Sequence, residues 1–257
     1  MNRILEIKNL SFSFQKGKPF FSDFNLTVNK NEIIGLLGSN GAGKTTLFEL
    51  ISGQKKNFSG EILLNDKNLK NCDLKEKAKL IAYIRQSQNQ QNSYLDAFHF
   101  ILEGRRPYTK FGNYSEKDHE IVRNILEEYD LSDFSDTLVS SLSGGEYQRC
   151  VLARAMAQQT DLILCDEPFS AMDMRYQKEF RDKIITESQK RGTAFLIILH
   201  NVNFAISLCT KIIFLKHGKI LFQDDPKKIS TDTLRETYDT EFEMLENNGK
   251  KFFSLFA

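Results

Sequence analysis

The chain has 257 residues, of which 40% are hydrophobic and 27% charged, and its formal net charge is +1. These values are ordinary for a globular protein, and without a basic tract they give no reason to expect nucleic acid as a partner. The longest apolar runs, such as residues 33–38 and 194–199, are far shorter than the roughly 20 residues of a membrane span. Charges at Arg3, Glu6 and Lys8 interrupt any signal-peptide core. We expect a cytoplasmic chain whose membrane contact, if any, is through a partner.

The first third of the chain predicts strands around one short helix. Residues 4–14 and 20–28 alternate between apolar and polar side chains, which is the pattern of half-buried strands. Residues 32–38 form a short apolar run that ends in glycine, and they predict a buried strand. A helix over residues 47–52 is expected to follow and to stop at Gly53. Two further strands are predicted at residues 61–65 and 80–84.

The middle third predicts a helical region over about residues 93–160. Apolar side chains recur there at helical spacing, and a third helix begins in the stretch 142–158. Loops are expected at residues 105–115 and 131–140. The helical spacing is set by two groups: Leu95, Phe98, Ile101 and Leu102, and then Ile121, Ile125, Leu126 and Tyr129.

Strands and helices alternate again in the last third. Alternation of continuous apolar strands with helices indicates a mostly parallel sheet that is covered on both faces. The residues after about 228 are expected to form a charged appendage with a short apolar end. The predicted elements are strands at 162–167 and 194–199, helices marked by Tyr176, Phe180 and Ile184 and by residues 201–208, and a hairpin over 211–222 that turns near His217 and Gly218.

A glycine-rich stretch between the strand at 32–38 and the following helix predicts a phosphate site. It reads GSNGAGKT and fits the pattern G-x-x-x-x-G-K-[ST]. Glycines allow tight turns and a close approach of backbone N–H groups to phosphate, Lys44 can reach the β and γ phosphates, and Thr45 offers a hydroxyl to Mg²⁺. An incidental glycine-rich loop would not be expected between a buried strand and a helix. The predicted ATP-binding residues are Gly38, Ser39, Asn40, Gly41, Ala42, Gly43, Lys44, Thr45 and Thr46.

Two carboxylates at the end of the strand 162–167 suit the same nucleotide. Asp166 can hold Mg²⁺ directly or through water. Glu167 can orient and deprotonate the attacking water, a role that contributes roughly 10²–10⁴-fold to a rate. By itself an Asp-Glu pair is most often an exposed turn, but here it follows an apolar strand in a chain with a phosphate loop.

A second anion site is predicted at residues 142–146, which read LSGGE. A serine and two glycines at a helix start can bind phosphate, yet the phosphates of the first nucleotide are already wrapped. The simplest geometry is reciprocal: Ser143, Gly144, Gly145 and Glu146 of one copy contact the ATP held by the other copy. The sequence therefore predicts a homodimer that ATP holds together and that loosens when the γ-phosphate is lost.

The stretches GSNGAGKTT, LSGGEYQR and LILCDEP, in this order, resemble the ATP-binding cassette of ABC transporters. The resemblance covers about residues 3–240. It implies an α/β P-loop NTPase of the ABC ATPase type, with a mostly parallel core sheet, an N-terminal antiparallel β part and an inserted helical subdomain. A single domain over residues 1–240, with the helical subdomain at about 90–160, and a C-terminal extension over 241–257 are then expected.

Four further positions match the family singly, and the resemblance assigns their roles. Phe14 stands where a tyrosine usually stacks on adenine, and Gln86 resembles the glutamine that touches Mg²⁺ or water and senses the membrane partner. Asp173, in SAMD, is placed at the dimer seam, and His200 resembles the histidine that contacts the γ-phosphate. Taken alone, each of these residues would more often be a solvated or structural side chain.

Three departures from the family pattern leave each chemical role in place. Phe14 replaces tyrosine but keeps a ring, Asn201 follows His200 where aspartate is common, and Phe169 replaces the usual threonine after proline. We therefore expect an active ATPase.

Residues 104–108 (GRRPY) and 200–203 (HNVN) are similar to importers of iron–siderophore complexes, haem and vitamin B12. The resemblance implies two copies beneath two membrane permease subunits, at the cytoplasmic face of the membrane, with cargo delivered by an external binding protein. The permease is expected to dock between Gln86 and about Tyr114, where a polar stretch turns apolar. The other interpretation of this stretch is a solvent loop with a core helix behind it.

A different class of function stays open, namely an ABC ATPase that works without a permease. Ribosome-associated and DNA-repair types are disfavoured, because the chain has one cassette and no long coiled-coil insertion. An iron–sulfur cluster assembly factor is harder to separate. A neighbouring permease gene would decide between the two.

Overall fold

The computed structural model describes residues 2–15, 17–85, 94–169, 172–247 and 249–255. It divides into two compact units. Unit 1 combines Met1–Asn71 with Ile185–Ala257, and unit 2 is Cys72–Ile184. Within the described part of the chain, no helix has the length and apolar character needed to cross a membrane.

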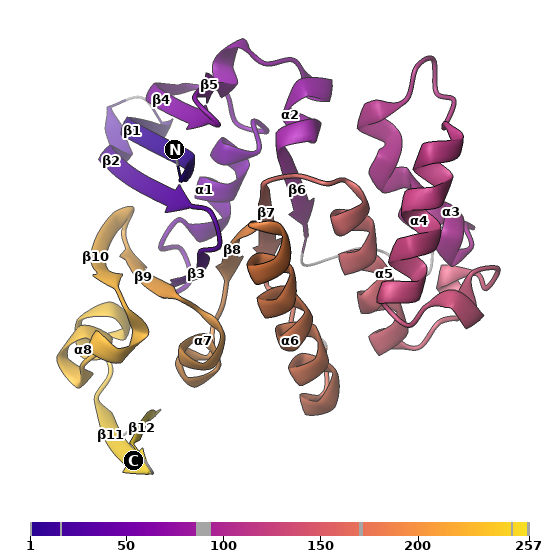
Figure 1. Cartoon of the computed structure of the whole chain (residues 1–257). Helices are drawn as coiled ribbons and strands as arrows, with labels where there is room; N and C mark the ends of the chain where they lie inside the picture. Colours follow the sequence, from indigo (N-terminus) through magenta and orange to yellow (C-terminus); the bar gives the residue numbers. More distant parts are fainter. Residues whose placement is uncertain (1, 16, 86–93, 170–171, 248, 256–257) are drawn as a thin grey trace. The chain divides into compact units, whose positions relative to one another are not determined.

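The amino-terminal part of unit 1 is an antiparallel sheet, as predicted (Figure 1). Leu5, Ile7, Leu10 and Phe12 on its longest strand are buried, so the alternating pattern of the sequence has produced one core-facing side. The strands lie in the order β2-β1-β4-β5, with β1 at Arg3–Gln15, β2 at Lys18–Asn29, β4 at Phe58–Leu64 and β5 at Lys67–Asn68, followed by the 3₁₀ turn η1 at Leu69–Asn71.

The second sheet of unit 1 places β3 between two parallel neighbours. Every residue of β3 and β8 is buried, which explains why these strands read as continuous apolar runs. The predicted hairpin turns at His217 and Gly218, which both have positive φ. The elements are β3 at Ile33–Leu37, α1 at Lys44–Ile51, β8 at Ala194–Ile198, α7 at Val202–Leu208, β9 at Lys211–Lys216 and β10 at Lys219–Asp224.

The carboxyl-terminal stretch is more ordered than the expected appendage. It forms η6 (Pro226–Lys228), α8 (Thr231–Tyr238) and a hairpin of β11 (Phe242–Asn247) and β12 (Lys250–Leu255). The side-chain amide of Asn203, on α7, donates to the carbonyl of Phe253 and accepts from its N–H, both at 2.8 Å. The Phe253 side chain is buried, so the hairpin is fastened to α7.

Unit 2 contains the predicted helical region, in which α3 and α4 both pack against α5 (Figure 1). It also contains two parallel strands, β6 and β7. The loop predicted at 105–115 is only partly correct, because 3₁₀ helix η3 extends through Tyr108. The elements are α2 at Leu74–Leu80, β6 at Ile81–Ile84, α3 at Ala97–Leu102, η3 at Glu103–Tyr108, α4 at Glu116–Glu128, η4 at Ser132–Phe134, η5 at Val139–Ser141, α5 at Gly144–Ala157, β7 at Leu162–Asp166 and the first part of α6, Met174–Arg191.

Candidate functional site: a phosphate loop and a capped glycine turn

The loop after β3 can only be built from glycine at its two ends. Gly38 has φ 146°, and a Cβ there would lie 2.1 Å from the carbonyl oxygen of Leu215. Gly43 has φ 110°, and a Cβ there would lie 2.5 Å from the ring of Phe20. Gly41 also has positive φ, with open space around it. These backbone angles and close approaches fix the loop in its curved form before any ligand binds.

The loop keeps its anion-binding groups uncovered by side chains. Gly43 is the N-cap of α1 and supplies no side-chain cap, so the first N–H groups of the helix have no side chain competing for them at that position. Lys44 is 7% exposed, and its ammonium donates to the carbonyls of Gly38 (2.7 Å) and Ser39 (3.1 Å). Asn40 and Thr45 are exposed. Curved backbone, helix start and lysine together fit the phosphates of a nucleotide.

Phe14 presents its ring to solvent on the same unit. Its residue is 58% exposed, although the ring makes an edge contact with Phe20 at 5.1 Å between centroids. Phe20 is the ring that packs against Gly43. The exposed ring is therefore connected to the phosphate loop through one intervening side chain, and its stacking on adenine stays a prediction.

His200 lies at the same sheet edge as the phosphate loop. It follows β8, which pairs in parallel with β3, and the carboxyl ends of parallel strands share an edge. The N–H of Leu199 donates to the carbonyl of Leu36 at 3.2 Å, which holds this edge together. Next to the exposed His200, Asn201 caps α7 by accepting from the N–H of Phe204 at 3.0 Å. Asparagine therefore performs the capping that aspartate would also perform.

Asp166 and Glu167 end β7 in unit 2. Asp166 is 7% exposed, and its carboxylate accepts from the hydroxyl of Tyr83 at 3.3 Å. Glu167 has φ 49°, a left-handed conformation that costs a non-glycine residue roughly 1–3 kcal/mol. Tyr83 was not identified from the sequence. The alternation of its strand gave no sign that its hydroxyl would face a carboxylate on the next strand.

The glycine turn that opens α5 is capped by its own side chains. Ser143 accepts from the N–H of Glu146 at 3.4 Å, and the Glu146 carboxylate accepts from the N–H of Ser143 at 2.8 Å. This is a capping box, and its hydrogen bonds from Ser143 hold the pKa of Glu146 below the ordinary value. The turn thus satisfies two backbone donors internally.

The segment after Glu167 is anchored to α6. The carboxylate of Asp173 accepts from the N–H of Tyr176 at 3.0 Å, and Gln177 donates to the carbonyls of Phe169 and Met172. Phe169, the departure from the family's threonine, is buried and packs edge-on against Phe180 at 5.2 Å. The predicted site residue Gln86 lies outside the described residues, as do Ser170 and Ala171 of SAMD.

The GRRPY segment has a structural role at Gly104 and Arg105, while Arg106 in the same segment is exposed. Arg105 is 5% exposed, and its guanidinium donates to Asp118 (2.9 Å), to the carbonyl of Ala157 (2.8 Å) and to Gln159 (2.9 Å). Gly104 has no room for a Cβ, which would lie 2.3 Å from the carbonyl oxygen of Arg154. The segment holds α4 and the end of α5 together because a buried cation needs several acceptors.

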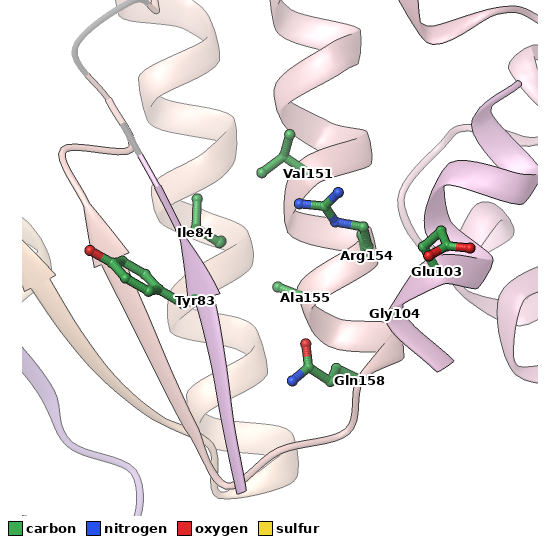
Figure 2. A pocket seen from close by; sticks show the side chains of 8 residues that line it. All are labelled: Tyr83, Ile84, Glu103, Gly104, Val151, Arg154, Ala155 and Gln158. Carbon is green, nitrogen blue, oxygen red and sulfur yellow. The ribbon is translucent and has the colours of Figure 1, made fainter. Parts of the chain in front are cut away.

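A pocket of about 250 Å³ opens in unit 2 between β6, η3 and α5 (Figure 2). Tyr83 and Ile84 line it from the strand and Glu103 from η3. Arg154, on α5, points its guanidinium toward the strand and also lies 4.4 Å from the ring of Phe100 (Figure 2). The hydroxyl of Tyr83, on the pocket wall, is the group that reaches Asp166. Tyr83 therefore connects the pocket to Asp166, a predicted Mg²⁺ ligand.

Residues 21–170 match the ABC transporter family, and the chain belongs to that family. It has the ABC ATPase fold, binds ATP, and is the ATPase subunit that drives transport. The predicted recognition and fold class are confirmed.

The chain is similar to several curated transport ATPases over most of its length. It is 34% identical to the petrobactin import ATP-binding protein YclP of Bacillus subtilis, with 92% of this chain and 93% of that protein covered. A probable iron chelatin transport ATP-binding protein of Helicobacter pylori is also 34% identical, with 96% and 97% covered. So is the lipopolysaccharide export ATP-binding protein LptB of Haemophilus influenzae, with 89% and 93% covered.

Among solved structures, the fold matches a chain described as a metal-chelate type ABC transporter in an inward-facing conformation. The TM-score is 0.85 at 24% identity, covering 100% of this chain and 98% of the other. At that identity the match supports the fold alone.

Proposed function

We propose that this chain hydrolyses ATP to drive the uptake of an iron chelate, haem or cobalamin through a membrane permease. The observation that carries the proposal is the match to petrobactin import and iron chelatin transport ATPases over more than nine tenths of this chain. The equal identity to a lipopolysaccharide exporter means that overall identity does not choose the cargo. The GRRPY segment and the residues after His200 are the local features that favour an importer.

In this proposal the nucleotide phosphates lie against the loop Gly38–Thr46, with Lys44 leaving its carbonyl partners for the β and γ phosphates. Phe14 stacks on adenine, and His200 contacts the γ-phosphate from the shared sheet edge. Thr45, Gln86 and Asp166 supply oxygen atoms of the kind that Mg²⁺ prefers. The bound ion would neutralise phosphate charge. Glu167 orients the attacking water and accepts its proton.

We further propose that a second copy completes each site. Ser143, Gly144, Gly145 and Glu146 of one copy then contact the ATP held by the other, with Asp173 at the seam. The capping box already satisfies the N–H groups of Ser143 and Glu146, so a phosphate from the partner would compete with it for the Ser143 hydroxyl. The dimer works at the cytoplasmic face of the membrane beneath two permease subunits, and an external binding protein supplies cargo.

The permease is proposed to dock near the pocket of unit 2. Tyr83 and Ile84, which line the pocket, immediately precede Arg85 and the predicted docking stretch that begins at Gln86. Exposed apolar side chains at Tyr94, Leu95 and Phe111 add surface that a permease helix could cover. The hydroxyl of Tyr83 gives a short physical route from this surface to Asp166.

Isolation of the intact complex tests the proposal. The tagged chain is purified from detergent-solubilised membranes of its own cells, and uptake of labelled ferric siderophore, haem and cobalamin is measured in cells that lack it. We expect a permease to co-purify and uptake of one of the three to fall, with rescue by the wild-type chain and none by Glu167→Gln. If no permease co-purifies, all three uptakes persist and iron–sulfur enzymes lose activity, the assembly-factor alternative is correct.

A further inference from the structure

Gly144 and Gly145, the first two residues of α5, are glycine for different physical reasons. Neither Gly144 nor Gly145 is among the residues with positive φ. Glycine inside a helix destabilises it by roughly 0.5–1 kcal/mol relative to alanine. Since no positive φ calls for glycine at these two positions, we ask whether the space around them does.

Among the residues that the structure describes, a spatial reason exists at Gly145 and not at Gly144. A Cβ on Gly144 would meet no atom within 4 Å, whereas one on Gly145 would lie 2.4–2.5 Å from three ring atoms of Tyr176. Gly145 is correspondingly buried and Gly144 exposed. The ring of Tyr176 therefore lies flat against the backbone of Gly145, and the approach to Gly144 is open.

Tyr176 belongs to the turn that carries Asp173. Its N–H donates to the Asp173 carboxylate at 3.0 Å, and the next residue, Gln177, donates to the carbonyls of Phe169 and Met172. The ring on Gly145 thus joins the glycine turn to the segment that follows Glu167 in the same chain.

We propose that Tyr176 is a positioning residue that sets the separation between the turn Ser143–Glu146 and Asp173. The inference rests on the proposed reciprocal dimer, in which both features reach the other copy. Gly145 is glycine to admit the Tyr176 ring, and Gly144 is the glycine that leaves room for the partner's phosphate. A misplacement of about 1 Å between such groups can lower a rate about 100-fold.

A double-mutant cycle separates this cause from a requirement at the phosphate. In a Glu167→Gln background, we expect Gly145→Ala to weaken ATP-dependent dimerisation by at least about tenfold, measured by light scattering. In Tyr176→Ala, where the ring is gone, adding Gly145→Ala should change dimerisation by about twofold or less. ATP affinity of the monomer should stay unchanged by calorimetry. If Gly145→Ala has the same effect in both backgrounds, the proposal is wrong.

The same cycle in nucleotide-free monomer gives a second measurement that needs no dimer. Gly145→Ala should lower the melting temperature when Tyr176 is present and leave it unchanged in Tyr176→Ala. A Glu167→Gln protein that never dimerises would refute the reciprocal site, while this thermal cycle would still decide whether Tyr176 constrains Gly145. Equal thermal effects in both backgrounds would refute that constraint.

Two matched variants test the ring itself. Tyr176→Phe keeps every ring atom that faces Gly145 and should dimerise like the parent, whereas Tyr176→Ala should dimerise about tenfold more weakly, which is still measurable. Gly144→Ala should have the same effect on dimerisation whether residue 176 is tyrosine or alanine. Loss of dimerisation in Tyr176→Phe would assign the role to the hydroxyl and overturn the proposal.

Discussion

The phosphate loop and the glycine turn both open a helix with glycines, and they prepare those helix starts in opposite ways. Gly43 caps α1 with no side chain, so no capping group competes for the first N–H groups of that helix, and Lys44 donates to the carbonyls of Gly38 and Ser39. Ser143 and Glu146 close a capping box, so the second turn satisfies two of its donors internally. No side-chain cap occupies the first helix start, whereas at the second an anion would compete with the cap for the Ser143 hydroxyl.

Under the proposed reciprocal dimer, one chain alone would bind ATP without hydrolysing it. Glu167→Gln should lower turnover by about 10²–10⁴-fold and leave ATP binding intact, because it removes a proton acceptor and no phosphate contact. Steady-state phosphate release and calorimetry measure the two properties. Turnover like that of the wild type would remove Glu167 from the proposed mechanism.

Substitution by alanine should be costly at Gly38 of the phosphate loop and tolerated at Gly144 of the turn before Glu146. Gly38→Ala should lower the free energy of unfolding by about 3 kcal/mol, because φ 146° and the contact with the Leu215 carbonyl both oppose a Cβ. Gly144→Ala is the matched control and should leave monomer stability unchanged or raise it by up to about 1 kcal/mol. Urea unfolding of the nucleotide-free proteins gives both values, and equal losses would contradict the distinction.

Lys44→Ala should weaken ATP binding by about 100-fold, because it removes the charge that faces the β and γ phosphates. Lys67→Ala, at an exposed surface position, is the control for loss of one positive charge. Calorimetry on both variants checks the expectation. ATP affinity that is the same in Lys44→Ala and Lys67→Ala would mean that the loop binds by backbone alone.

Ser143→Arg should leave the affinity of the monomer for ATP unchanged and weaken ATP-dependent dimerisation by at least about tenfold, because the side chain fills the approach to the turn. Ser132→Arg adds the same charge at an exposed position of the same unit. Both are compared by light scattering in the Glu167→Gln background. A dimer that still forms with Ser143→Arg would refute the reciprocal site.

The smallest effect concerns the capping box. Glu146→Ala should lower monomer stability by about 1 kcal/mol at neutral pH, the usual value of a lost cap. The folded state holds the pKa of Glu146 below its ordinary value of 4.5. The stability that its carboxylate contributes is therefore fully present above pH 4.5 and is lost as the pH falls through the lowered pKa. The stability difference between wild type and variant should therefore shrink in acid. A difference that does not depend on pH would argue against the carboxylate as the cap.

Much of the phosphate-loop site was predictable because its sequence motif determines the shape of the loop. The pattern from Gly38 to Thr45 fixes loop shape, and the apolar runs at β3 and β8 fix a shared edge for His200. The short helices α2 and α8 were missed because α2 buries no residue and α8 buries only Leu234 and Thr237, which leaves little periodicity to detect. The D-x-x-E capping box at Asp73 was the available signal for α2.

The contacts that distinguish Gly145 from Gly144 could not be predicted from the sequence. The ring of Tyr176 reaches Gly145 only because α5 and α6 pack in a particular register, which no local pattern specifies. The same is true of Tyr83 and Asp166, which meet across two strands, and of Arg105, whose three acceptors are scattered from residue 118 to residue 159. Local motifs identify which groups bind, whereas tertiary packing decides what holds them in place.

The fastening of Phe253 to Asn203 has a practical consequence at the bench. The helix that starts just after His200 is held by two hydrogen bonds to Phe253, on strand β12. Deleting residues 250–255, or inserting a tag among them, would remove this contact from α7. Affinity tags and fusions therefore belong away from residues 250–255, and activity measured on a variant that lacks them would include the loss of this contact.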